Sequence, residues 1–240
     1  MLTTGRFPSF EVIAFDADDT LWDCQSHFAH VERHLCRLMA PWCDAETAAS
    51  RLFETERGNM ALLGYGSKAF TISVLETALA ITHGEAPTAL LAELLAMGKA
   101  VSDMPATPLP GVCDTLRWVR DCGREAGHAP RMVVFTKGEP LEQENKLERS
   151  GLKPFFDDME IVSTKGEREF LNLCDRLHIQ PEEMLMVGNS FKSDIAPALR
   201  IGAYAVHIPF HVVWQLEHSE EFDHERLVRL DRFEELRNLL

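Results

Sequence analysis

A pair of carboxylates, Asp16 and Asp18, lies in the stretch EVIAFDADDTLW, which begins at Glu11. The residues before the pair, 12–15, form an unbroken apolar run, which is typical of a short strand covered on both faces of its sheet. Ligands of open parallel sheets bind beyond the carboxyl ends of the strands. The spacing therefore predicts that Asp16 and Asp18 do nucleophilic or acid–base chemistry. The alternative is a turn or helix cap, where Asp and Thr are also common.

Further polar residues follow later segments that are predicted to be strands of the same sheet. They are Thr136 after 132–135, Lys165 after 159–162, and Asn189 and Asp194 after 184–187. Because parallel strands present their carboxyl ends at one edge, we expect these side chains to lie near Asp16. Carboxylates, a hydroxyl and a cation at one place are the parts of a magnesium-dependent phosphoryl-transfer site.

The elements that would hold these residues alternate between strand and helix beyond residue 104. Strands are predicted at the three runs above and at 203–208, and helices at 111–125, 141–150, 167–177 and 195–201. Such alternation implies right-handed crossovers and a parallel sheet. From His224 we predict a charged amphipathic helix with Leu227, Leu230 and Phe233 on its apolar side. The predicted fold class is α/β, with a Rossmann-like parallel sheet and helices on both faces.

Residues 24–103 show helical patterns instead, with no convincing strand. The predicted helices cover 25–40, a segment that starts after the capping residue Asp44 and ends at Gly58, 68–82, and 88–101. We therefore predict an inserted four-helix domain at 24–103, within a core formed by 1–23 and 104–240. Between the second and third helices lies a glycine-rich stretch that contains Tyr65 and Lys68.

Composition excludes several classes of partner. The chain of 240 residues has a formal net charge of -14, which argues against nucleic acid, since binding a phosphate backbone requires concentrated Lys and Arg. No apolar run is long enough to cross a bilayer, and the opening MLTTGRFPSF lacks the segments of a secretory signal, so a cytoplasmic location is expected. Six cysteines without CxxC spacing indicate reduced thiols, with no zinc or redox site.

In order and spacing, FDADDT, FTKG, Lys165 and VGNSFKSD resemble the motifs of the haloacid dehalogenase-like hydrolase superfamily. The helical insertion lies where that superfamily carries its cap domain. The resemblance implies that Asp16 attacks phosphorus to form an aspartyl-phosphate and that Asp18 is the general acid and base. It also implies that Thr136, with the backbone N–H of Lys137, holds phosphate oxygens and that Lys165 neutralises charge.

The resemblance further implies a Mg²⁺ ion bound by the Asp16 side chain, the Asp18 backbone carbonyl and the fourth motif. Here the sequence departs from the pattern, because Asn189 stands where many relatives have aspartate. An amide offers an oxygen but no charge, so we expect weaker metal binding unless Asp194 supplies the carboxylate. We expect Asp194 to be the essential acid of this motif and Asn189 to be a ligand, directly or through water.

The resulting hypothesis is a phosphatase that hydrolyses a small soluble phosphomonoester, acting as a monomer or homodimer. Tyr65 and Lys68 are the candidates for substrate contact, although their stretch is equally typical of a flexible loop. The alternatives are a phosphomutase or phosphonate hydrolase of the same superfamily, with Lys68 as the Schiff-base lysine, or a non-catalytic binding module whose metal site has lapsed. Residues His207, His211, Glu217 and His218 are too loosely spaced to predict a second metal site.

Overall fold

The computed structural model describes residues 7–125 and 129–240 of the chain. These residues divide into two compact units. The sheet unit comprises the described residues up to Asp23, together with Ala106–Lys137 and Gln143–Leu240. The helical unit comprises Cys24–Pro105 and Gly138–Glu142. Among the described residues, no helix is both long and apolar enough to cross a bilayer.

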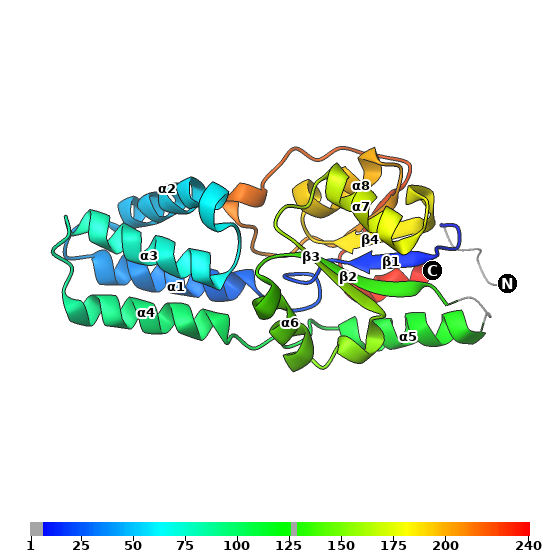
Figure 1. Ribbon diagram of the computed structural model, residues 1–240, viewed down its shortest axis with the longest axis horizontal. Coiled ribbons are helices and arrows are strands. Elements are labelled where there is room, and N and C mark those ends of the chain that lie inside the picture. Colours follow the sequence, from blue (N-terminus) through cyan, green and yellow to red (C-terminus); the bar gives the residue numbers. More distant parts are fainter. Residues whose placement is uncertain (1–6, 126–128) are drawn as a thin grey trace. The chain divides into compact units, whose positions relative to one another are not determined.

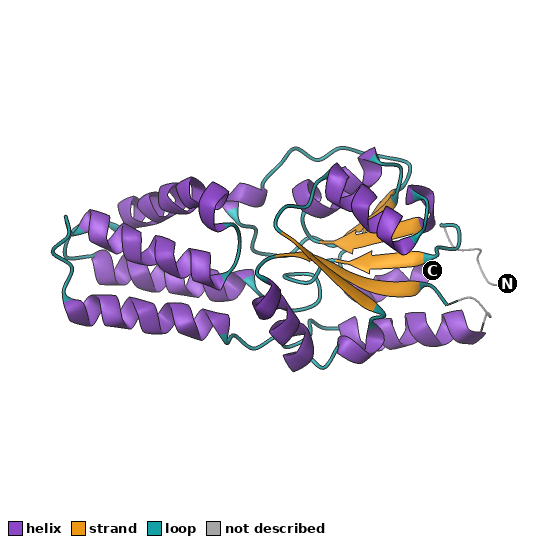
Figure 2. Cartoon of the chain, viewed as in Figure 1, coloured by secondary structure: helices purple, strands orange, loops and turns teal. Residues whose placement is uncertain are grey.

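A parallel sheet forms the centre of the sheet unit, which confirms the predicted fold class (Figure 2). Its strands, as far as the chain is described, are β1 (Val12–Phe15), β2 (Arg131–Lys137), β3 (Asp158–Val162), β4 (Met184–Gly188), β5 (Tyr204–His207) and β6 (Leu227–Arg229). They lie in the order β3-β2-β1-β4-β5-β6, and all neighbours pair in parallel. Strand β1 is therefore flanked by β2 and β4, and the ends of all three strands lie at one edge.

Helices cover both faces of this sheet (Figure 1). The helices of the sheet unit are α5 (Val112–Glu125), α6 (Pro140–Arg149, shared with the helical unit), α7 (Glu167–Leu177) and α8 (Ala196–Arg200), with a π-helical turn η3 (Phe191–Ile195) and 3₁₀ turns η1 (Lys153–Phe155), η2 (Pro181–Glu183), η4 (Gln215–Glu217) and η5 (Phe233–Asn238). Ile13 and Phe15 of β1 pack in the core that contains α5 and η5, whereas Val12 and Ala14 pack in the core that contains α7 and α8. This two-sided burial explains the unbroken apolar run of β1.

The prediction of an amphipathic helix from His224 was wrong. In the structure Leu227–Arg229 form β6, which pairs with β5 through Ala205↔Leu227 and Val206↔Val228. The apolar spacing also fits a helix, but β5 offers an unpaired edge, and ladder hydrogen bonds with burial of adjacent apolar residues outweigh local periodicity. A short 3₁₀ turn, η5, follows the strand.

The helical unit contains α1 (Gln25–Met39), α2 (Ala45–Leu63), α3 (Ser67–Ile81) and α4 (Thr88–Ser102). Asp44 caps α2 as predicted, because its side chain accepts a hydrogen bond of 2.7 Å from the backbone of Thr47. The predicted end of α2 at Gly58 was wrong, since the helix continues to Leu63 and ends at Gly64, which has a φ of +67°. One glycine costs a helix only about 1 kcal/mol, and the next residue, Asn59, is held by side chains of α3.

Candidate active site

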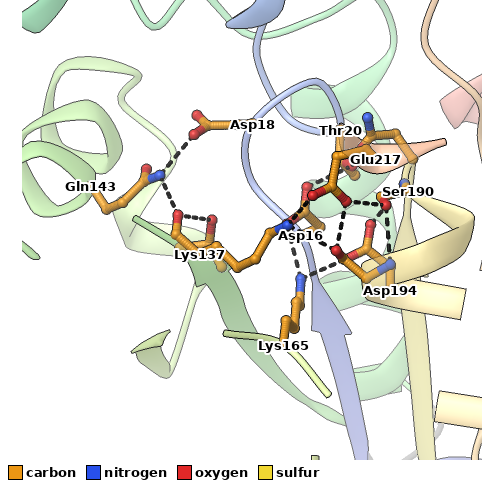
Figure 3. Close-up of polar contacts among 12 residues, drawn as sticks. Asp16, Asp18, Thr20, Lys137, Gln143, Lys165, Ser190, Asp194 and Glu217 are labelled. Atoms are coloured by element: carbon orange, nitrogen blue, oxygen red, sulfur yellow. Dashed lines mark hydrogen bonds and ion pairs between the residues drawn. The ribbon is translucent and has the colours of Figure 1, made fainter. Parts of the chain in front are cut away.

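Three charged side chains meet at the carboxyl edge of the sheet, where the sequence placed them (Figure 3). Asp16 follows β1, Lys165 follows β3, and Asp194 lies in η3 after β4. The Lys165 ammonium is 2.9 Å from Oδ1 of Asp16 and 2.6 Å from Oδ1 of Asp194. Because the Lys165 side chain is fully buried and Asp194 is 1% exposed, water screens these charges weakly.

The charge of this cluster is unbalanced in the absence of another cation. Burial raises the pKa of the Asp16 carboxyl, and the charge of Asp194 raises it further, to about 7, although Lys165 opposes the shift. Two buried carboxylates therefore share one ammonium. A divalent cation beside Asp16 would favour the ionised carboxylate that nucleophilic attack requires.

Oxygen atoms suited to such a cation lie next to Asp16. The Thr20 hydroxyl is 3.1 Å from Oδ2 of Asp16 and 3.2 Å from Oδ1 of Asn189. One hydroxyl carries one hydrogen, so it donates to one of these oxygens at a time, and the other keeps its lone pairs for a different partner. No set of three His, Cys, Asp or Glu side chains within the described chain has the arrangement of a metal site. The donor set nevertheless fits Mg²⁺, which prefers oxygen ligands and uses few carboxylates.

Asp194 is fixed through both of its oxygens. Oδ1 faces Lys165, and Oδ2 accepts a hydrogen bond of 2.9 Å from the backbone of Ser190. The carboxylate packs directly against Gly188 at the end of β4, where a Cβ atom would overlap it. Only glycine therefore leaves room for Asp194 in this position.

We expect Gly188→Ala to lower the free energy of unfolding by about 1–3 kcal/mol through overpacking and to reduce turnover roughly 10- to 100-fold by displacing Asp194. Urea unfolding and steady-state kinetics measure both effects. Gly58→Ala is the matched control, because position 58 is an exposed helix position with open space around it. The free energy of unfolding of this control is expected to rise by about 0.5–1 kcal/mol. An unchanged free energy of unfolding in Gly188→Ala would contradict the packing argument.

Asp18 does not join this cluster in the structure. Its Oδ1 is 2.7 Å from the Lys146 ammonium and 2.7 Å from the indole nitrogen of Trp22, and its Oδ2 accepts a bond of 2.7 Å from Gln143. Burial alone would raise the pKa of Asp18, but the charge of Lys146, with hydrogen bonds from Lys146, Gln143 and Trp22, lowers it below the usual range. The carboxylate is therefore held ionised, beside a lysine that is 1% exposed.

Thr136 and Lys137 end β2 beside Asp16. The Thr136 hydroxyl is buried and lies 3.3 Å from the carbonyl of Lys137. The Lys137 ammonium is 2.6 Å from Oε1 of Glu217 and 2.8 Å from the hydroxyl of Ser193. Oε2 of Glu217 accepts bonds of 2.6 Å from both Ser190 and Ser193.

Glu217 comes from η4, in the segment between β5 and β6. Burial alone would raise the pKa of its carboxyl, but the Lys137 charge and the hydroxyl donors lower it to about 2. Glu217 is therefore a charged, part-buried member of the site.

Comparison with known proteins gives the family. The model of the haloacid dehalogenase-like hydrolases matches residues 10–202. The chain belongs to this family. The matched residues include Asp16, Asp18, Lys165 and Asp194, so the hydrolase assignment covers the cluster described above.

Similar proteins include phosphatases. The glyceraldehyde 3-phosphate phosphatase of Methanopyrus kandleri is 32% identical over 106 residues, which span 42% of this chain and 43% of that protein. The glyceraldehyde 3-phosphate phosphatase of Pyrococcus furiosus is 27% identical over 227 residues, or 89% and 88% of the two chains. A haloacid dehalogenase-like family hydrolase from Xanthomonas campestris has a TM-score of 0.81 at 27% identity, covering 93% of this chain and 87% of the other.

Several residues that contact the site of this haloacid dehalogenase-like hydrolase were not predicted to do so from the sequence. Gln143 and Lys146 are three positions apart on α6 and therefore share a helix face, a signal that could have paired them with an acid. Thr20 ends the first motif, FDADDT, but its contacts with Asp16 and Asn189 were not predicted. Glu217 lies in an irregular segment whose course no periodicity predicts, and it contacts Lys137 and Ser190 beside the cluster. His207, another of the four tail residues, bonds to the carbonyl of Asn189.

The predicted substrate-contacting residues of the hydrolase lie in the helical unit, Tyr65 between α2 and α3 and Lys68 in the first turn of α3. Lys68 pairs with Glu139 at 3.2 Å, and Glu142 accepts a hydrogen bond from the first backbone N–H of the helix, at Ser67. Their contact with substrate remains a prediction.

Proposed function

We propose that this hydrolase is a magnesium-dependent phosphatase that acts on a small phosphomonoester through an aspartyl-phosphate at Asp16. The observation that carries the proposal is the buried cluster of Asp16, Lys165 and Asp194 at the carboxyl edge of the sheet. The family and its phosphatase members support it. We also infer that the enzyme works in the cytoplasm as a monomer or homodimer, without a nucleic acid or membrane partner.

In the first step, an oxygen of Asp16 attacks phosphorus, and the bond to the leaving oxygen breaks. Lys165 offsets the negative charge of the Asp16 carboxylate and of the phosphoryl group, and Thr136 with the backbone N–H of Lys137 holds phosphoryl oxygens. Mg²⁺, held by Asp16, the Asp18 carbonyl, Asn189 and Asp194, would supply the remaining positive charge.

Asp18 then acts as acid and base, which requires its side chain to leave Lys146. In its present position the lysine keeps Asp18 ionised, whereas donation to the leaving oxygen needs the protonated acid. Rotation away from Lys146 removes the partner that lowers its pKa, so the carboxyl gains a proton more readily. After the alcohol leaves, Asp18 takes a proton from the water that hydrolyses the intermediate.

We infer that the four helices at 24–103 act as the cap that shields this chemistry from bulk water and selects the substrate. Tyr65 and Lys68 would contact the part of the substrate beyond the phosphate. The glyceraldehyde 3-phosphate phosphatases among the relatives favour a short phosphorylated carbon chain as the first substrate class to test.

The proposal is tested by the release of nitrophenol from p-nitrophenyl phosphate by EDTA-treated protein, before and after addition of Mg²⁺. We expect turnover to depend on the metal, with a millimolar requirement because Asn189 contributes no charge to the site. Asn189→Asp should lower the Mg²⁺ concentration for half-maximal rate roughly 10-fold. Equal rates with and without Mg²⁺ would contradict the metal-dependent mechanism.

A further inference from the structure

Lys137 extends across the end of the strand that carries the nucleophile. Its backbone belongs to β2, yet its ammonium bonds to Ser193, which lies in η3 after β4. Because β1 lies between β2 and β4, the Lys137 side chain must pass over the carboxyl end of β1, where Asp16 is located. Figure 3 shows the Lys137 side chain extending from the end of β2 toward Glu217.

The partner that holds Lys137 there is an anion supplied by the protein itself. One oxygen of the Glu217 carboxylate accepts a hydrogen bond from the Lys137 ammonium, and the other accepts hydrogen bonds from the hydroxyls of Ser190 and Ser193. A cation with convergent hydroxyl donors is also the chemistry that binds a phosphoryl group. The Lys137 and Glu217 side chains are 14% and 13% exposed, so little solvent screens their interaction.

A phosphate group at Asp16 would compete with Glu217 for this ammonium. The backbone N–H of Lys137 is proposed to hold the phosphate, and its side chain crosses the carboxyl end of β1, where the phosphoryl group would bind. If both bound the Lys137 ammonium, the Glu217 carboxylate and a phosphate dianion would repel each other, since like charges a few ångströms apart interact strongly where water is scarce. Both cannot remain on the same ammonium without cost.

We propose that the Lys137 side chain is a second phosphate-binding cation beside Lys165, and that Glu217 is its counter-ion in the ligand-free enzyme, displaced from the ammonium by phosphoryl oxygens. This inference rests on the proposed phosphatase function. Ser190 and Ser193 keep hydrogen bonds to the carboxylate after the exchange, so Glu217 stays near the site. Glu217 thereby limits the affinity for phosphate, which is also the product that must leave.

The two ends of the ion pair predict opposite changes in phosphate binding. Lys137→Met removes the cation and should raise the dissociation constant of inorganic phosphate about 10-fold or more, whereas Glu217→Gln removes the competing charge and should lower it roughly 3- to 10-fold. Isothermal titration calorimetry of the full chain with inorganic phosphate, in the presence of Mg²⁺ at pH 7.5, measures both without requiring turnover.

Lys137→Arg and Glu220→Gln serve as controls. Lys137→Arg keeps the charge and should bind phosphate within about threefold of the natural chain, and Glu220→Gln removes an exposed charge from the same segment and should change binding less than about twofold. Weaker binding in both Lys137→Met and Glu217→Gln would show a purely structural ion pair and overturn the inference. So would undetectable phosphate binding by the natural chain.

Failure of the phosphatase proposal gives a different result. Opposite shifts in phosphate affinity without turnover of any phosphate ester would support the anion site and contradict the catalytic function. Metal-dependent turnover by the natural chain, with phosphate affinity lost in both Lys137→Met and Glu217→Gln, would support the catalytic function and contradict the proposed role of the ion pair.

Discussion

Lys165→Met is expected to lower turnover about a thousandfold and the free energy of unfolding by about 3–5 kcal/mol. The lysine is the charge that Asp16 and Asp194 share, and its side chain is fully buried. Without it, two carboxylates face each other away from water, and one of them must take up a proton or the site must open. The same substitution removes the positive charge that nucleophilic attack on a phosphate requires.

Chemical denaturation and steady-state kinetics at pH 7.5 measure these losses. Lys153→Met is the matched control, since Lys153 pairs with Glu148 on the surface, where both side chains are about two-thirds exposed. Exposed pairs contribute at most about 1 kcal/mol, so this control should unfold and turn over nearly as the natural chain does. A loss of less than about 1 kcal/mol in Lys165→Met would contradict the view that this ammonium holds the cluster together.

Asp16→Asn is expected to abolish turnover, by roughly 10⁴-fold or more, and at the same time to stabilise the metal-free fold. A raised pKa means that the folded state disfavours the ionised carboxyl, and each pKa unit corresponds to about 1.4 kcal/mol. With the pKa of Asp16 raised to about 7, the cost of ionisation grows as pH rises from about 4 to about 7 and then stays constant. The neutral amide does not carry this cost.

The stability gain should therefore depend on pH. In EDTA at pH 8 we expect the free energy of unfolding of Asp16→Asn to exceed that of the natural chain by roughly 2 to 4 kcal/mol. At pH 4 the difference should nearly vanish. Added Mg²⁺ should reduce the gain at pH 8, because the ion favours the ionised carboxylate of the natural chain only. A stability gain of Asp16→Asn that is smaller at pH 8 than at pH 4 would refute the electrostatic argument.

The sheet and the central cluster were predictable because they depend on strong local signals. Strands β1, β2 and β4 contain apolar runs, and in a parallel sheet the carboxyl ends of the strands share an edge, so the sequence predicts that Asp16, Lys165 and Asp194 lie near one another. The position of the Asp18 carboxylate could not be predicted in this way, because it depends on side-chain choice among neighbours. Lys146 and Gln143 provide those neighbours, and they lie on a helix, not at a strand end.

Non-local pairing explains the remaining errors. Strand β6 forms because β5 has a free edge, and Glu217 reaches the site because an irregular segment returns to it after β5. Neither fact has a trace in the periodicity of the residues concerned. The amphipathic spacing around Leu227 is equally compatible with helix and strand until the partner is known.

Gln143 donates hydrogen bonds both to Asp18 and to the carbonyl of Lys137, and so connects the proposed acid–base residue to the strand end that would hold the phosphate. To turn toward a leaving group, as proposed, Asp18 would give up bonds from Gln143, Lys146 and Trp22, each worth about 1.5–3 kcal/mol to a charged acceptor. A single water molecule cannot replace all of these hydrogen bonds. We therefore expect Asp18 to stay on Lys146 in the ligand-free enzyme and to rotate only when a bound substrate supplies contacts that compensate for the lost bonds.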